Sequence, residues 1–114
     1  MSWSNPIRLA SWADAPDEAG IYEIGFFRGS VFTPLYIGRA KGNTTTIRSR
    51  LMSHYREIGN SFIAEYIKNA TRDNLYCRTM KTGRAVSKEA NLLYTHGCGE
   101  GTRYPWNQRI EHQG

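Results

Sequence analysis

Two short segments rich in aromatic and β-branched residues, separated by three turn-forming residues, limit the fold of this chain more than any other feature. Residues 20–27 read Gly-Ile-Tyr-Glu-Ile-Gly-Phe-Phe and residues 31–38 read Val-Phe-Thr-Pro-Leu-Tyr-Ile-Gly, with Arg28-Gly29-Ser30 between them. Such runs are typical of β-strands, and strands joined so closely pair as an antiparallel hairpin. We therefore expect a sheet that contains this hairpin.

The rest of the chain alternates between helical and strand patterns. Apolar residues at Ile47, Leu51, Tyr55 and Ile58 predict a helix that ends at Gly59, after a loop over residues 39–45. The other expected elements are an irregular N-terminal arm over residues 1–19, a helix from Ser61, a third strand over residues 75–82 and a helix over residues 85–94 ended by Gly97. The order β-β-α-α-β-α predicts an α/β (α+β) fold with a small three-stranded sheet.

Length and composition favour one domain over residues 1–114. The chain has 114 residues without a repeat or a linker rich in Pro, Gly and Ser. It has no apolar stretch near the ~18 residues that a membrane span requires, and residues 1–14 lack the apolar core of a secretion signal. Two cysteines, Cys77 and Cys98, are too few for a disulfide framework. We expect a soluble, cytoplasmic protein that does not bind membranes.

Positive charge is concentrated in the middle of the chain. Lys and Arg number 15 against 10 Asp and Glu, for a net charge of +5, and residues 24–84 carry eleven basic and three acidic side chains. Eleven of the basic residues are arginines, whose planar guanidinium groups suit phosphate and nucleic acid. A solvated basic surface would show the same charge, so both interpretations stay open.

Glu89 breaks the apolar pattern of the last expected helix. It lies three residues after Val86 and just before Ala90, Leu92 and Leu93, so it borders the face that should enter the core. A carboxylate in that position must be exposed, paired or bound to a metal ion, because an unpaired buried charge is costly. A glutamate paired with an arginine explains the position as well as a metal ligand does.

Arg50 and His54 form a second candidate pair. They lie one helical turn apart, on one flank of the apolar stripe of the first expected helix. Together an arginine and a histidine can hold a phosphate or assist proton transfer. An ordinary basic, solvated helix is the competing interpretation.

Six segments, in order, resemble the motifs of the GIY-YIG nuclease family. They are Gly20-Ile21-Tyr22, Leu35-Tyr36-Ile37-Gly38, Arg39-Ala40-Lys41, residues 47–50 with His54, residues 88–93 around Glu89, and Tyr104-Pro105-Trp106-Asn107. The resemblance covers most of the chain, from Gly20 to about Asn107. It implies a central three-stranded antiparallel sheet flanked by helices, in agreement with the pattern above.

The resemblance also implies an activity: hydrolysis of DNA phosphodiester bonds with one divalent ion, Mg²⁺ or Mn²⁺. The catalytic residues it implies are Tyr22, Tyr36, Arg50, His54 and Glu89. Glu89 would hold the metal ion, Arg50 would stabilise the phosphate, and Tyr22 would act as the general base with help from Tyr36 or His54. The substrate-binding residues it implies are Gly38, Arg39, Lys41, Arg48 and Asn107.

Several alternatives stay open at this point. The loop after Gly38 is long, so Arg48 competes with Arg50 for the catalytic position, and Tyr55 competes with His54. His54 could replace Tyr22 as the base, and Asn107 could have a structural role. The chain could also be a non-catalytic DNA-binding module, or a nuclease that needs a partner or a branched substrate. A single site cuts one strand, so double-strand cleavage would need a homodimer or a larger complex.

Overall fold

A computed structural model describes residues 2–42, 44–56, 74–96 and 104–107. These residues form an α+β fold with a four-stranded sheet. Along the chain the elements are strand β1 (Ile7–Arg8), the 3₁₀ segment η1 (Leu9–Asp14), strands β2 (Gly20–Arg28) and β3 (Val31–Ala40), helix α1 (Ile47–Tyr55), strand β4 (Tyr76–Lys81) and helix α3 (Ala85–His96). Neither helix of the described part combines the length and apolar character needed to cross a membrane.

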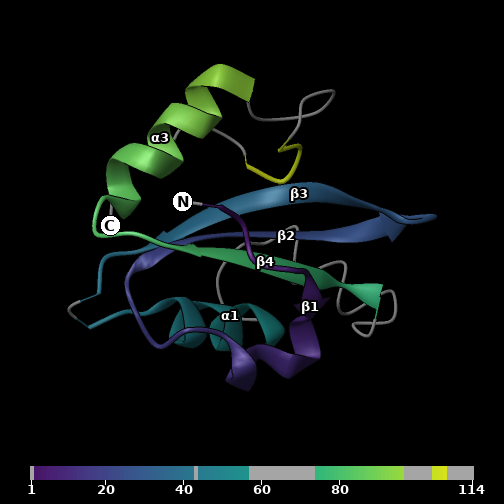
Figure 1. The fold of residues 1–114 in the computed structure, drawn as a ribbon, viewed down its shortest axis with the longest axis horizontal. Helices are drawn as coiled ribbons and strands as arrows, with labels where there is room; N and C mark the ends of the chain where they lie inside the picture. Colours follow the sequence, from purple (N-terminus) through teal and green to yellow (C-terminus); the bar gives the residue numbers. More distant parts are fainter. Residues whose placement is uncertain (1, 43, 57–73, 97–103, 108–114) are drawn as a thin grey trace.

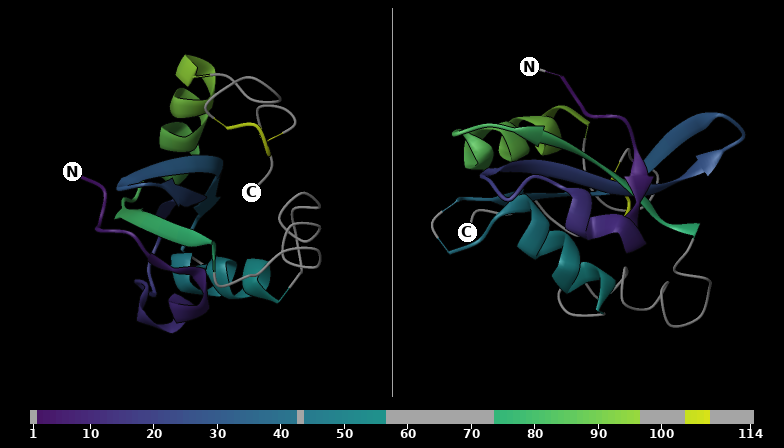
Figure 2. Two further views of the ribbon diagram at one scale, coloured as in Figure 1. Left: turned by 90° about the vertical axis from the view of Figure 1, so that its right-hand side faces the viewer. Right: turned by 60° about the horizontal axis from the view of Figure 1, so that its bottom comes forward.

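The sheet separates two layers of helical structure (Figures 1 and 2). Its strand order is β1-β4-β2-β3 and every pairing is antiparallel, so β2 is central and β3 lies at an edge. On one face α1 and η1 pack over a core that includes Leu9, Leu51 and Cys77. On the other face α3 packs over a second core with Leu93 and Tyr104. Burial of apolar side chains on both faces of the sheet holds the layers together.

The predicted hairpin is confirmed, and the prediction of a three-stranded sheet is wrong. Residues 1–19 are not an irregular arm, because β1 adds a fourth strand beside β4, with Ile7 opposite Cys77. The Ser4 and Leu9 backbone amides donate to the Thr79 and Leu75 carbonyls and so satisfy the outer edge of β4. The loop expected from residue 39 begins later, because β3 continues to Ala40. The helix expected to reach Gly59 ends earlier, at Tyr55. The expected helix from Ser61 and the expected stop at Gly97 lie outside the described residues.

A bulge sets the register between β2 and β3. Ile24 pairs with Tyr36 but Gly25 pairs with Pro34, which leaves Leu35 as the extra residue. Gly25 has to be glycine here, because a Cβ atom would lie 2.0 Å from the Thr33 carbonyl oxygen. The Leu35 carbonyl oxygen instead accepts a 2.8 Å hydrogen bond from the Trp106 amide. The bulge therefore determines which residues of β3 lie opposite Tyr22 and Ile24.

Helix α1 begins with a capping box at Thr46 and Ser49. The Thr46 hydroxyl accepts from the Ser49 amide at 3.2 Å, and the Ser49 hydroxyl accepts from the Thr46 amide at 2.9 Å. The next two amides, of Ile47 and Arg48, donate to the carbonyls of Glu18 and Pro16. These contacts attach α1 to the segment between η1 and β2.

We predict that Thr46→Ala lowers the free energy of unfolding by about 1 kcal/mol, the usual cost of losing a threonine cap. Urea unfolding followed by circular dichroism measures this change. Thr44→Ala, at an exposed threonine of the same loop, is the control and should unfold like the wild type. An equal loss in both variants would contradict a capping role for Thr46.

Candidate functional site

The antiparallel pairing of β2 and β3 directs candidate residues to both faces of the sheet. Tyr22 lies opposite Gly38, and Ile21 lies opposite Arg39. Because successive side chains of a strand point to opposite faces, Tyr22 and Gly38 face α1, whereas Ile21 and Arg39 face α3. The clusters of packed side chains agree, since Tyr22 belongs to the core under α1 and Ile21 to the core under α3. The candidate site is thus built on both sides of the edge strand β3.

Tyr22, Tyr36 and His54 are in mutual contact on the α1 face. The Tyr22 hydroxyl lies 2.9 Å from His54 Nε2 in a buried hydrogen bond. The Tyr36 ring centroid lies 6.4 Å from that of Tyr22 and 5.3 Å from that of His54. Tyr22 and His54 are buried, whereas Tyr36 is partly exposed. The structure therefore brings Tyr22 and Tyr36 into contact with His54, which lies 32 residues after Tyr22 in the chain.

Gly38 permits the Tyr22 ring to lie directly over β3. A Cβ atom on Gly38 would lie 2.3 Å from both Cζ and the hydroxyl oxygen of Tyr22. No side chain fits into that space without displacing the ring. Gly38 thus leaves room for the Tyr22 hydroxyl, and its predicted contact with substrate stays a prediction.

We predict that Gly38→Ala destabilises the protein by about 1–3 kcal/mol, the usual cost of overpacking a core. Gly83→Ala is the matched control, because nothing lies within 4 Å of its Cβ position. Thermal unfolding of both variants tests the prediction. An unchanged melting temperature for Gly38→Ala would mean that Tyr22 does not lie over this position.

Arg50, and not Arg48, shifts the pKa of Tyr22. Burial raises the pKa of Tyr22, and the charge and hydrogen bonding of Arg50 oppose that rise. The pKa of Arg50 is in turn raised, first by the charge of Tyr22 and then, against the effect of burial, by hydrogen bonding to the same residue. Arg48 instead donates from Nε to the Ala15 carbonyl at 2.9 Å. Of the two arginines, Arg50 is therefore the one beside the Tyr22 hydroxyl.

His54 and Tyr55 are neighbours in α1, but their side chains make different contacts. Tyr55 is partly buried against the core under α1, whereas His54 reaches the Tyr22 hydroxyl. Burial, followed by the charge of Arg50, lowers the pKa of His54 from 6.5 to about 3. His54 is therefore neutral at physiological pH, and its Nδ1 atom has no hydrogen-bond partner among the described residues.

We predict that His54 makes the folded state less stable in acid. Its pKa is lower in the folded than in the unfolded chain, so the unfolded chain binds the extra proton between pH 6.5 and about 3. The contribution is fully present above pH 6.5 and decreases as the pH falls, by up to about 1.4 kcal/mol per pH unit. Urea unfolding at several pH values should show a shallower pH dependence for His54→Gln. Identical slopes for the two proteins would contradict the buried, neutral histidine.

Glu89 is buried on the α3 face and forms an ion pair with Arg39. Arg39 Nη1 donates to Glu89 Oε1 at 2.6 Å, and the exposed fractions of the two side chains are 4% and 3%. Buried pairs of this kind hold both groups in a fixed position, and removing one partner typically costs 3–5 kcal/mol. Glu89 still acts on the pKa of Tyr22, which its negative charge raises. The carboxylate therefore lies within electrostatic reach of the Tyr22 hydroxyl.

The donor set at Glu89 fits a hard, hydrated cation. Within the described part of the chain no group of three or more His, Cys, Asp and Glu side chains comes together. Mg²⁺ is commonly held by one or two carboxylates, with waters and substrate phosphates as its remaining ligands. A single buried carboxylate is compatible with that mode and does not suit a structural zinc ion, which needs four protein ligands.

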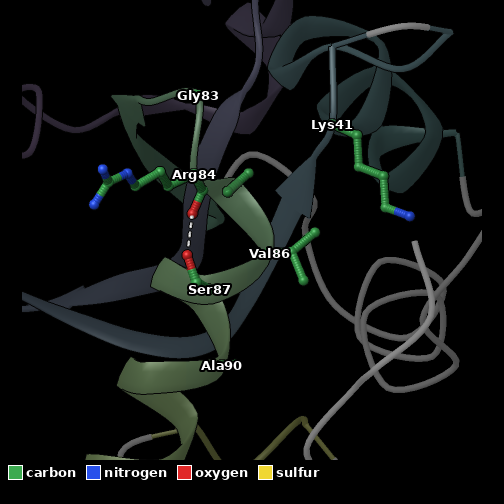
Figure 3. A pocket seen from close by; sticks show the side chains of 7 residues that line it. Lys41, Gly83, Arg84, Val86, Ser87 and Ala90 are labelled. Atoms are coloured by element: carbon green, nitrogen blue, oxygen red, sulfur yellow. Dashed lines mark hydrogen bonds between the residues drawn. The ribbon is translucent and has the colours of Figure 1, made fainter.

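Lys41 lies beside a pocket at the start of α3 (Figure 3). The pocket has a volume of about 420 Å³, and its lining includes Lys41, Arg84 and Val86. In Figure 3 the Lys41 side chain hangs from the end of β3 on one side, and the first turn of α3 forms the other side. Both Lys41 and Arg84 are exposed, so this end of the site carries positive charge.

Asn107 contacts the backbone of the edge strand. Its Oδ1 accepts from the Ile37 amide at 2.9 Å and its Nδ2 donates to the Ile37 carbonyl at 3.0 Å. These two bonds satisfy a backbone position that would otherwise lack a partner at the sheet edge. The buried side chain of Asn107 is thus used to hold β3 in place between Tyr36 and Gly38.

The sequence predicted an arginine partner for Glu89 as one of its alternatives, but it did not identify the partners in two charged contacts on the α3 face. Arg39 was expected to bind substrate, and its pairing with Glu89 across 50 residues has no local signal. Glu23 was not singled out, yet it is fully buried, pairs with Arg78 Nε at 2.6 Å and accepts from the Tyr104 hydroxyl. For Glu23, the signal in the sequence was a carboxylate in the middle of an otherwise apolar strand.

Comparison of the chain with protein-family models, with curated proteins and with solved structures gave no match.

Proposed function

We propose that the protein is a divalent-metal-dependent endonuclease that hydrolyses DNA phosphodiester bonds, as its resemblance to the GIY-YIG family implies. The observation that carries this proposal is the surroundings of the Tyr22 hydroxyl. It lies 2.9 Å from a neutral imidazole, beside a guanidinium group and within electrostatic reach of a carboxylate. A base, a cation for phosphate and a ligand for a metal ion are the groups that phosphodiester hydrolysis needs.

Tyr22 is the proposed general base, and His54 positions it. A neutral imidazole carries one proton; we place it on Nε2, because a proton on Nδ1 would be a buried N–H without a partner among the described residues. His54 Nε2 then donates to the Tyr22 oxygen, and this hydrogen bond together with the Arg50 charge favours the phenolate against burial, which raises the pKa of Tyr22. The phenolate accepts a proton from the attacking water.

Arg50 and Glu89 have separate proposed roles. Arg50 binds the phosphate oxygens and stabilises the charge that they gain in the transition state. Glu89 would hold the Mg²⁺ or Mn²⁺ ion, which when bound polarises the phosphate and stabilises the leaving oxygen. Arg39 holds the Glu89 carboxylate in its orientation through the 2.6 Å contact. Lys41, and Arg84 across the pocket from it, would bind flanking phosphates.

A non-catalytic DNA-binding module is the second candidate, and one observation favours it. Tyr22 is fully buried and Glu89 is 3% exposed and paired with Arg39, so neither group faces solvent. For catalysis, the partly exposed Tyr36 and Arg50 side chains must move so that the substrate can reach Tyr22. A cytoplasmic location, and a homodimer or larger complex for double-strand cleavage, stay predictions.

Cleavage of supercoiled plasmid distinguishes the two candidates. We expect nicked circles with Mg²⁺ or Mn²⁺ and none with EDTA, and we expect Tyr22→Phe and Glu89→Gln to lower the nicking rate at least about a hundredfold, the scale of losing a catalytic acid–base group. A wild type that binds DNA at low salt but does not nick it, in any metal, would support the non-catalytic module instead.

Matched variants separate loss of chemistry from loss of folding. Tyr104→Phe removes another buried hydroxyl, and Glu23→Gln removes another buried, arginine-paired carboxylate. Unlike Glu89, neither Glu23 nor Tyr104 is among the groups whose charge shifts the pKa of Tyr22. Both variants should lower the melting temperature as much as Tyr22→Phe and Glu89→Gln do, yet nick plasmid at the wild-type rate. Equal losses of activity in all four variants would contradict the proposed site.

A further inference from the structure

A row of aromatic rings and arginines lies on the α3 face of the sheet, at the outer end of the β2–β3 hairpin. We call it the aromatic–arginine row; it consists of Trp3, Arg8, Phe27, Phe32, Tyr76 and Arg78. The pairing register places these residues on one face, because Phe27 lies opposite Phe32, Gly25 opposite Tyr76 and Glu23 opposite Arg78. Glu23 faces α3, since its carboxylate accepts from the Tyr104 hydroxyl.

Each member of the row contacts the next. The Arg78 guanidinium lies 4.8 Å from the Trp3 ring centroid and 5.2 Å from that of Phe32. Phe32 meets Phe27 at 5.9 Å, and Phe27 meets Tyr76 at 4.9 Å with the rings nearly perpendicular. The Arg8 guanidinium then lies 5.6 Å from the Tyr76 ring centroid. The contacts hold the rings in place and so reduce the entropy lost on binding a ligand.

The row is accessible at its outer end. Phe27 is 36% exposed, Phe32 and Tyr76 are partly exposed, and Arg8 is exposed. Helix α3 lies over the opposite end of the hairpin, and neither described helix lies over this end (Figure 1). Exposed aromatic side chains that gather on one surface commonly mark an interaction site.

The chemistry of the row selects one class of ligand. Aromatic rings bind nucleobases by stacking, and arginines beside them add phosphate and cation–π contacts. A duplex keeps its base faces stacked internally, whereas an unpaired strand presents them. Arg8, which is exposed at the end of the row, gives the surface positive charge that a nucleic acid complements. We propose that the aromatic–arginine row binds unpaired nucleotides of a DNA substrate.

This inference rests on the proposed function, because it takes DNA as the ligand. It adds which kind of DNA the protein binds. Phe27 is five residues from Tyr22 along β2, a separation of about 16 Å at the rise of a strand, and it points to the opposite face of the sheet. A strand of DNA that reaches both residues therefore passes around the edge strand β3. A substrate that reaches both places has an unpaired stretch a few nucleotides from the bond that is cut. The protein would therefore prefer branched or partly single-stranded DNA over an intact duplex.

Binding measured without cleavage tests the proposal. A labelled oligothymidylate and a labelled duplex of equal length are titrated with the protein in EDTA, and the anisotropy is followed. We expect Phe27→Ala to weaken single-strand binding roughly tenfold, the effect of losing one base–ring stack, and to leave duplex binding unchanged. Phe27→Trp should restore single-strand binding. Val31→Ala, at a 64% exposed residue of the same hairpin, should behave as the wild type.

The outcomes separate this inference from the proposed function. Unchanged single-strand binding by Phe27→Ala, or an equal loss for duplex, overturns the inference, even if the wild type still nicks plasmid. Selective loss in Phe27→Ala together with wild-type protein that never nicks supports the row and contradicts the nuclease. A melting temperature for Phe27→Ala close to that of Val31→Ala shows that any loss reflects the missing ring.

Discussion

The register of β2 against β3 is the constraint on which the candidate site depends. One extra residue, Leu35, shifts the pairing so that Gly38 comes to lie opposite Tyr22. Because Gly38 has no side chain, the Tyr22 ring can lie over β3 and its hydroxyl can reach His54 Nε2. A shift by one residue would turn Tyr22 and Arg39 to the wrong faces of the sheet. Gly25 at the bulge and Asn107 on the Ile37 backbone both protect this register.

Charged groups buried on the α3 face give that face a fixed arrangement. Glu23 is held by Arg78 and Tyr104, and Glu89 by Arg39. Such pairs add little net stability compared with apolar residues, but losing one partner leaves an uncompensated charge. An alternative packing of α3 on the sheet would leave Arg39 and Glu89 unpaired, so this pair favours one position for the helix. That position decides where the Glu89 carboxylate lies relative to Tyr22.

The two proposed functional regions lie at different ends of the same hairpin. Tyr22, Tyr36 and Gly38 are on the half of the hairpin that α1 and α3 cover, and Phe27 and Phe32 are near the exposed turn. The covered end provides the dry surroundings in which electrostatic effects on a phosphate are strong. The open end provides ring faces to which a flexible strand can bind. One hairpin can thus connect recognition with chemistry through a rigid pair of strands.

The sequence by itself determined the hairpin, the helices that begin at residues 47 and 85, and the short set of polar residues worth testing, because strand and helix periodicity and turn residues are local signals. It could not determine that β1 completes the sheet, because a two-residue strand has no periodicity of its own. The spacing to His54 favoured Arg50 over Arg48, but the sequence could not show which arginine pairs with Glu89. Those choices depend on contacts between segments far apart in the chain, which only the packing of α1 and α3 on opposite faces of the sheet decides.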